Sequence, residues 1–264
     1  MMLTISTLLA VVFYFAAASI QFLKLKRRIT LNGSIIKGCA IAGMLMHTFA
    51  LYLVLHRPDG INLGTFIAGS LVGWLVAGVV VISSLRQQID NLYIGVLPMA
   101  ALAALTAIWL PNLGTTKLYS GGLLLHILLS ILAYSIFTVA TFQAFLLSMQ
   151  DQALKQHHTR GLVSSLPPLQ TMERLLFEML WIGISLLTAS LITGFIYVDD
   201  FFAQHLVHKT VFTMLAWLLY AVLLWGHKVQ GWRAQKAVRW TISGFFLLMI
   251  GFFGSKMVIE VLNL

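Results

Sequence analysis

The feature that most constrains this chain is a series of eight long apolar stretches separated by short polar segments. A helix needs roughly 20 mostly apolar residues to cross the hydrocarbon core of a bilayer. Stretches of about that length occur near residues 3–22, 35–55, 65–85, 93–110, 121–148, 176–197, 210–226 and 238–260. They predict an all-α fold, a polytopic membrane bundle with eight transmembrane helices.

The composition excludes several soluble classes of protein. Hydrophobic residues make up 59% of the 264 residues and charged residues only 9%, whereas a soluble domain has about 45–50% and about 25%. So few charged side chains cannot cover a globular surface, which argues against a soluble enzyme, a disordered region and a secreted disulfide scaffold. We therefore expect residues 1–264 to form a single integral membrane domain whose main partner is the lipid bilayer.

The net charge of +9 reflects membrane topology and not nucleic-acid binding. A nucleic-acid surface needs clustered Lys and Arg among aromatic residues, but here the cations lie in short segments between apolar stretches. If successive segments alternate across the membrane, thirteen Lys and Arg lie on the side reached after the first, third, fifth and seventh stretches. Four lie on the other side. Cytoplasmic segments carry the excess of Lys and Arg, so both termini are predicted to face the non-cytoplasmic side.

Histidines are frequent on the non-cytoplasmic side predicted by this topology. His126 lies near the outer end of the fifth stretch and His47 in the outer part of the second. His205 and His208 precede the seventh stretch, and they share a face if residues 204–209 are helical. Neutral imidazole binds haem iron, zinc or copper. These histidines are therefore candidate ligands for a metal or for haem.

Haem fits this setting better than zinc does. An apolar, aromatic-lined slot suits the macrocycle, and its iron takes one or two axial histidines, whereas a zinc site usually has four ligands that often include thiolates or carboxylates. Asp199 and Asp200 are the acidic residues near these histidines. A structural interpretation stays open, because a histidine such as His126 also hydrogen-bonds neighbouring helices in membrane bundles.

Motifs for covalent catalysis are missing from the sequence. It contains no phosphate-binding loop, no dinucleotide-binding glycine pattern, no His-Glu-x-x-His zinc motif and no Gly-x-Ser-x-Gly elbow. We therefore expect that the protein is not an enzyme.

Three stretches in the C-terminal half resemble a known family. These are GGLLLHILLSILAYSIF around His126, residues 166–195 (LPPLQTMERLLFEMLWIGISLLTASLITGF), and residues 209–258 with Gly-Trp-Arg-x-x-Lys-Ala. Their order and spacing are similar to those of the membrane cytochrome c assembly proteins of the CcsA/CcmC type, and most of all to the HemX-like and YpjD-like branch. The similarity covers residues 121–264, whereas residues 1–120 are only generically hydrophobic.

The resemblance implies a function and a set of site residues. Members of the family bind or move haem at the outer face of the membrane during cytochrome c maturation. By resemblance, His126 matches a haem-ligating histidine, and His208 precedes the helix that follows the family's tryptophan-rich outer segment. That segment has no tryptophan here, and Phe201 and Phe202 are candidates for a partial aromatic platform.

These matches imply a haem-binding protein of the bacterial inner membrane with an accessory or regulatory role in cytochrome c biogenesis. Its partners would include other cytochrome assembly or membrane proteins. His126 and His208 are the predicted axial ligands, and His47 and His205 are further candidates for cofactor binding.

Two other classes of function stay open at this point. Glycines in the second and third stretches and Pro98 in the fourth permit the close packing or broken helices found in transporters and channels for small solutes or ions. A membrane interaction protein without a ligand is the other alternative. Copurification of haem would favour the haem-binding interpretation over these two alternatives.

Overall fold

The structure is a computed structural model. It describes residues 1–26, 28–29, 31–58, 60–86, 89–110, 116–157, 166–197 and 204–251. At residues 57, 86, 116–117 and 204–208 it describes the backbone alone.

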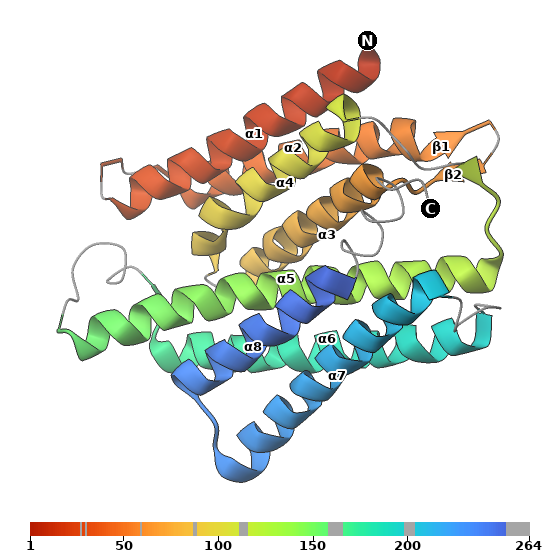
Figure 1. Cartoon of the computed structure of the whole chain (residues 1–264). Helices are drawn as coiled ribbons and strands as arrows, with labels where there is room; N and C mark the ends of the chain where they lie inside the picture. The colour runs from red at the N-terminus through yellow and green to blue at the C-terminus, as the bar shows by residue number, and fades with distance from the viewer. Residues whose placement is uncertain are drawn as a thin grey trace. The chain divides into compact units, whose positions relative to one another are not determined.

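Within these ranges the chain forms eight α-helices, one short 3₁₀ helix and three short strands (Figure 1). The elements in chain order are α1 (Met2–Leu25), α2 (Gly33–Leu55), β1 (His56–Arg57), β2 (Gly60–Asn62), α3 (Thr65–Arg86), η1 (Asp90–Leu92), α4 (Tyr93–Trp109), β3 (Thr116–Lys117), α5 (Gly121–Lys155), α6 (Leu169–Tyr197), α7 (Gln204–Gln230) and α8 (Ala234–Met249).

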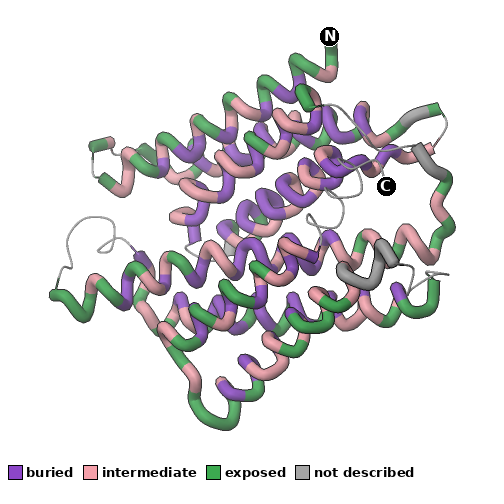
Figure 2. Tube along the Cα trace, viewed as in Figure 1, coloured by how far each residue is buried: buried purple, intermediate pink, exposed green. Residues whose placement is uncertain are grey.

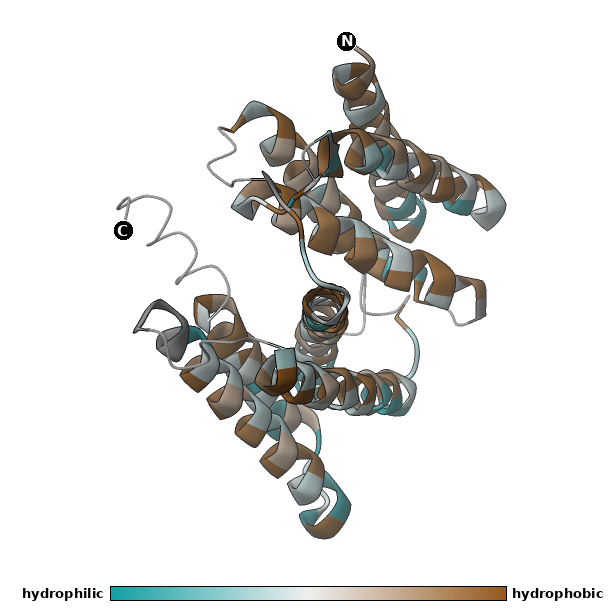
Figure 3. Cartoon of the chain, turned by 90° about the vertical axis from the view of Figure 1, so that its right-hand side faces the viewer, coloured by the Kyte–Doolittle hydropathy of each residue, from teal (hydrophilic) through white to brown (hydrophobic). Residues whose placement is uncertain are grey.

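Seven helices in the described part of the chain, α1 to α7, are long and apolar enough to cross a membrane. Hydrophobic residues extend along the lengths of these helices (Figure 3). The predicted helical membrane bundle is therefore confirmed for these seven. The eighth predicted span, residues 238–260, overlaps α8, and its residues 252–260 lie outside the described residues. The direction in which the termini face stays a prediction.

The helices form two compact units, α1 to α4 with the short strands in the first and α5 to α8 in the second. In both units the side chains between helices are buried, while those on the outward faces are exposed (Figure 2). Exposed large apolar residues on these faces are expected for a bundle surrounded by lipid rather than by water.

The centre of the second unit is a pair of aromatic rings held between two glycines. Phe137 of α5 stacks on Tyr220 of α7 with ring centroids 4.1 Å apart. Gly183 of α6 lies against Phe137, and Gly244 of α8 lies against Tyr220, so closely that an added Cβ would come within 2.8 Å and 2.6 Å of the rings. The Tyr220 hydroxyl donates to the carbonyl of Thr241 at 3.2 Å. This core joins all four helices of the unit.

Helix starts follow local sequence signals. Asn32 and Ser120 accept hydrogen bonds from the backbone N–H groups of Ser34 and Leu123, and so cap α2 and α5. Pro168 precedes α6, and its carbonyl accepts the N–H groups of Thr171 and Met172. Two prolines, Pro167 and Pro168, thus stand directly before this helix. The helix begins at Leu169, earlier than the apolar stretch suggested, because its first turns are polar.

A small antiparallel sheet in the first unit was not predicted. β1 pairs with β2 through His56 and Ile61, and β2 pairs with β3 through Ile61 and Lys117. Pro58 cannot continue α2 and restricts the residue before it to extended backbone, while Gly60 has a φ of 128° that favours glycine. These two residues turn the chain back on itself, and the pairing is too short for a sequence pattern to reveal.

Candidate functional site around His126

His126 lies in the second turn of α5, which begins at Gly121. At about 1.5 Å of rise per residue, it is about 8 Å along the axis from the start of the helix. Its side chain is neither fully buried nor fully exposed. This depth agrees with the position near a helix end that the sequence suggested.

The Nδ1 atom of His126 lies 2.8 Å from the backbone carbonyl oxygen of Ser190 in α6. A carbonyl oxygen only accepts hydrogen bonds, so Nδ1 carries the proton and donates it. Within the described part of the chain, Nε2 has no hydrogen-bond partner. A histidine that binds a metal commonly donates its other ring N–H to a carbonyl or carboxylate, which fixes the tautomer and the ring orientation. His126 has this arrangement.

Three hydroxyl side chains surround the His126 contact. Ser130 donates to the carbonyl of His126 at 2.8 Å, and its oxygen lies 2.7 Å from that of Ser190. Thr193 donates to the Ser190 carbonyl at 3.0 Å, and its hydroxyl also lies 3.5 Å from His126 Nδ1. The hydroxyl network holds α5 and α6 in register at His126, so the ring has a fixed position between the two helices.

The beginning of α7 lies close to this part of α5. Lys209 is near enough to His126 to interact with it electrostatically, and the hydroxyl of Thr213 lies beside that of Tyr134. Lys209 is the residue after His208, so the backbone of the first turns of α7 lies at the same end of the unit as His126 (Figure 1). A cation close to the histidine was not predicted, although its position next to His208 was visible in the sequence.

The other predicted residues of this region are only partly described. Residues 204–208 are helical, as expected for His205 and His208 to share a face, but their side chains are not described. Phe201 and Phe202 lie outside the described residues. Ligation by His208 and His205, and an aromatic platform from the two phenylalanines, therefore stay predictions.

His47 belongs to the first unit and is fully buried. Its Nδ1 lies 3.3 Å from the Tyr14 hydroxyl and its Nε2 lies 2.9 Å from the Ser70 hydroxyl. Both ring nitrogens are thus engaged by side chains of α1 and α3, which gives His47 a structural role in this arrangement. Its predicted part in cofactor binding is not tested.

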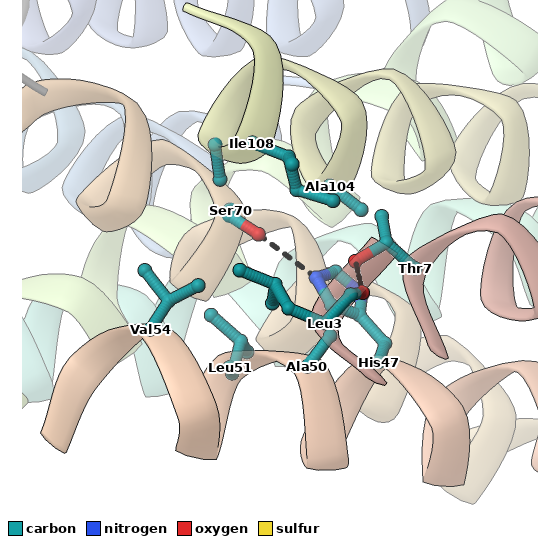
Figure 4. Close-up of a pocket in the computed structure, with 10 residues that line it drawn as sticks. Leu3, Thr7, His47, Ala50, Leu51, Val54, Ser70, Ala104 and Ile108 are labelled. Carbon is teal, nitrogen blue, oxygen red and sulfur yellow. Dashed lines mark hydrogen bonds between the residues drawn. The ribbon is translucent and has the colours of Figure 1, made fainter. Parts of the chain in front are cut away.

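A small cavity of about 10 Å³ lies beside His47 and is lined by residues of α1 to α4 (Figure 4). Thr7 and Ser70 supply its hydroxyl groups, and most of the other residues around it are apolar, such as Leu3 and Ala104. The volume is below the roughly 300–1,000 Å³ that is usual for sites of drug-sized ligands. The pocket is therefore a poor fit to a large planar cofactor.

A second histidine with the same hydrogen-bonding pattern lies at the opposite end of the second unit. His227 of α7 donates from Nδ1 to the carbonyl of Trp232 at 2.8 Å and stacks on Phe177 with centroids 3.4 Å apart. In the sequence, His227 lies between Trp225 and Trp232. The hydrogen bond depends on the turn between α7 and α8, which periodicity does not predict.

No group of three or more His, Cys, Asp or Glu residues within the described ranges converges in a way that could hold a metal ion. Around His126 the described residues place one ring nitrogen without a hydrogen-bond partner, a hydroxyl network that orients the ring, and a nearby cation.

The sequence pattern of the family described as Cytochrome C assembly protein matches residues 1–263. The chain belongs to the cytochrome c assembly protein family. The match confirms the predicted family and extends it to residues 1–120, where the sequence had shown no specific resemblance.

Two relatives agree with this family membership. The inner membrane protein YpjD of Escherichia coli K12 is 32% identical over 227 residues, which cover 85% of this chain and 86% of that protein. The protein HemX of Brevibacillus brevis is 24% identical over 134 residues, 50% of this chain and 49% of HemX. No solved structure matches the chain.

Proposed function

We propose that this protein binds haem at the end of the second unit where His126 lies, with Nε2 of His126 as an axial ligand. The observation that carries the proposal is the 2.8 Å hydrogen bond from Nδ1 of His126 to the Ser190 carbonyl. It directs the proton to Nδ1 and leaves Nε2 as the ring nitrogen available to a ligand. Haem iron takes one or two axial histidines in proteins, so this donor fits the group.

The residues around His126 suit a flat, largely apolar molecule that carries carboxylates. Tyr197 of α6 is an exposed aromatic side chain that packs against Gly122, one turn before His126 on the same face of α5. Lys209 adds a positive charge close to His126, which favours the carboxylate groups of haem by charge attraction. We propose His208 as the second axial ligand because the backbone of α7 brings it to the same end of the unit.

We further propose an accessory or regulatory, non-enzymatic role in cytochrome c assembly at the bacterial inner membrane, with both termini on the non-cytoplasmic side. Family membership and the relative named as an inner membrane protein support this proposal. The excess of Lys and Arg on one side supports the orientation. Other assembly proteins are the expected partners.

The experiment is haem titration of the detergent-purified protein, followed by its Soret absorption. The wild type should bind haem, and His126→Gly should bind it more weakly and recover the absorption when free imidazole is added. Recovery by imidazole distinguishes a lost ligand from a lost fold. His56→Ala is the matched control, because His56 is exposed and its Nδ1 bonds only the Tyr52 carbonyl of its own helix.

Two results would contradict the proposal. Wild-type protein that takes up no haem would leave a transporter or a ligand-free interaction protein as the better interpretation. A His126→Gly variant with unchanged absorption would show that the haem ligand lies elsewhere in the chain.

A further inference from the structure

The turn between α7 and α8 presents a basic surface at the end of the second unit opposite His126. Its four cations are Lys228, Arg233, Lys236 and Arg239, and all four side chains belong to exposed residues. We call these four residues, together with Trp225 and Trp232, the hairpin patch. The turn is coloured mostly as exposed in Figure 2.

The carboxylates at this end of the unit already have partners other than the four cations of the patch. Asp151 of α5 pairs with Lys155 at 2.7 Å, and Glu178 of α6 pairs with Arg174 at 3.6 Å. Glu173 accepts the backbone N–H of Ala234 at 3.4 Å. Among the described residues, no carboxylate lies within ion-pair distance of the four patch cations. The patch therefore has an excess positive charge.

The backbone of the patch is held in place before any ligand arrives. The N–H of Trp232 donates to the Gly226 carbonyl at 3.2 Å, and its own carbonyl accepts from His227. The indole lies so close to Gly226 that an added Cβ would come within 2.5 Å of the ring. The Nζ atom of Lys236 lies 3.5 Å from the centre of this indole. The turn thus fixes an indole and an ammonium group side by side.

The start of α8 is also fastened to α5. Gln235 donates from its side-chain nitrogen to Asp151 at 3.0 Å, and Ser148 donates to the Gln235 side-chain oxygen at 3.2 Å. Because these bonds fix the rotation of α8, its basic face stays turned outward. Beyond Arg239 the same face continues with Ile242 and Phe246, both exposed.

We propose that the hairpin patch binds the headgroups of anionic phospholipids. The order along α8, cations first and exposed apolar residues after them, matches a phosphate headgroup followed by acyl chains. Tryptophan is favoured at the boundary between headgroups and hydrocarbon, and each Lys or Arg near an anionic surface strengthens attraction by a factor of about five. The fixed indole and the excess positive charge distinguish this surface from Lys and Arg residues that only set the orientation of the protein in the membrane.

The test uses the full chain in vesicles with identical leaflets, so that orientation does not affect the result. Tryptophan quenching by brominated phosphatidylglycerol is compared with quenching by brominated phosphatidylcholine. The wild type should be quenched more strongly by the anionic lipid, and raising the salt to about 1 M should reduce the difference, because the Debye length falls to about 3 Å.

The variant R233Q/K236Q/R239Q should lose the preference for the anionic lipid, by about fivefold in relative affinity for each cation removed. The matched control K24Q/K26Q/R28Q removes three cations near the end of α1 and should keep the preference. The variant R233K/R239K keeps the charge and should also keep it, which protects the test if the triple variant folds poorly.

Two outcomes would overturn the proposal. An unchanged preference in R233Q/K236Q/R239Q would mean that the patch does not bind lipid, and an acidic protein segment would then be the occupant to test. Equal losses in that variant and in K24Q/K26Q/R28Q would mean that only total charge matters.

Discussion

Gly122 and Tyr197 pack so closely that no methyl group fits between the glycine and the tyrosine ring. Gly122 lies one turn before His126 on the same face of α5, and Tyr197 is the last residue of α6. The packing of these two residues therefore sets how closely α5 and α6 approach beside the proposed haem ligand.

Replacing Gly122 with Ala should displace Tyr197 and weaken haem binding. Overpacking typically costs about 1–3 kcal/mol, which exceeds the gain of about 1 kcal/mol that Ala brings to a helix interior. Haem affinity from Soret titration and thermal unfolding followed by circular dichroism measure the two effects. Gly121→Ala is the control, since a Cβ at Gly121 meets nothing within 4 Å, and equal behaviour of the two variants would contradict the packing argument.

Replacing Lys209 with Gln should weaken haem binding without changing the iron ligand. Lys209 interacts electrostatically with the His126 region, and an exposed charge pair contributes about 0.2–1 kcal/mol. We expect up to about a fivefold loss of affinity, a weaker salt dependence than in the wild type, and an unshifted Soret maximum. Lys228→Gln at the other end of α7 should bind haem normally, and a shifted maximum in Lys209→Gln would speak against a purely electrostatic role.

Replacing His47 with Ala should lower stability and leave haem binding intact. The change removes two hydrogen bonds, to Tyr14 and Ser70, and net contributions of about 0.5–1.5 kcal/mol for each bond give a loss of about 1–3 kcal/mol. Denaturation in detergent measures the loss, and haem titration of the folded variant tests the ligand role. A folded His47→Ala protein without a Soret band would make His47 a ligand after all.

Replacing Gly183 or Gly244 with Ala should destabilise the second unit by about 1–3 kcal/mol, because each added methyl group would collide with the stacked rings of Phe137 and Tyr220. Adding Phe137→Leu to Gly183→Ala should recover part of the loss by making room. Gly38→Ala serves as the reference, because a Cβ at Gly38 meets nothing within 4 Å. Melting temperatures test this: Gly183→Ala and Gly244→Ala should melt below Gly38→Ala, and the double variant should melt above Gly183→Ala alone.

Much of the helical frame could be predicted from the sequence, because it depends on local signals. Apolar stretches of sufficient length place α1 to α7, and residues such as Ser120 and Pro168 mark where helices begin. The eighth predicted span is described only in part. The small sheet was missed because Ile61 pairs with Lys117, a partner far away in the sequence that no local pattern indicates.

The candidate site could be predicted only in outline. His126 was chosen as a candidate from its depth in an apolar stretch and from the family resemblance. Its orientation depends on the backbone carbonyl of Ser190. Every residue has such a carbonyl, so the sequence does not reveal this contact. Lys209 was missed because charge proximity requires the packing of α7 on α5. The hydrogen bonds of His47 could not be predicted, because the sequence does not reveal that Tyr14 and Ser70 contact its two ring nitrogens.

The contacts of His47 also bear on the order in which the chain is assembled. Tyr14, His47 and Ser70 come from α1, α2 and α3, and translation delivers them in that order. While the third helix is still in the ribosome or the insertion machinery, the His47 imidazole lies in hydrocarbon without its Ser70 partner. Entry of the third helix supplies Ser70, so this buried imidazole has both of its partners only after three crossings have been made.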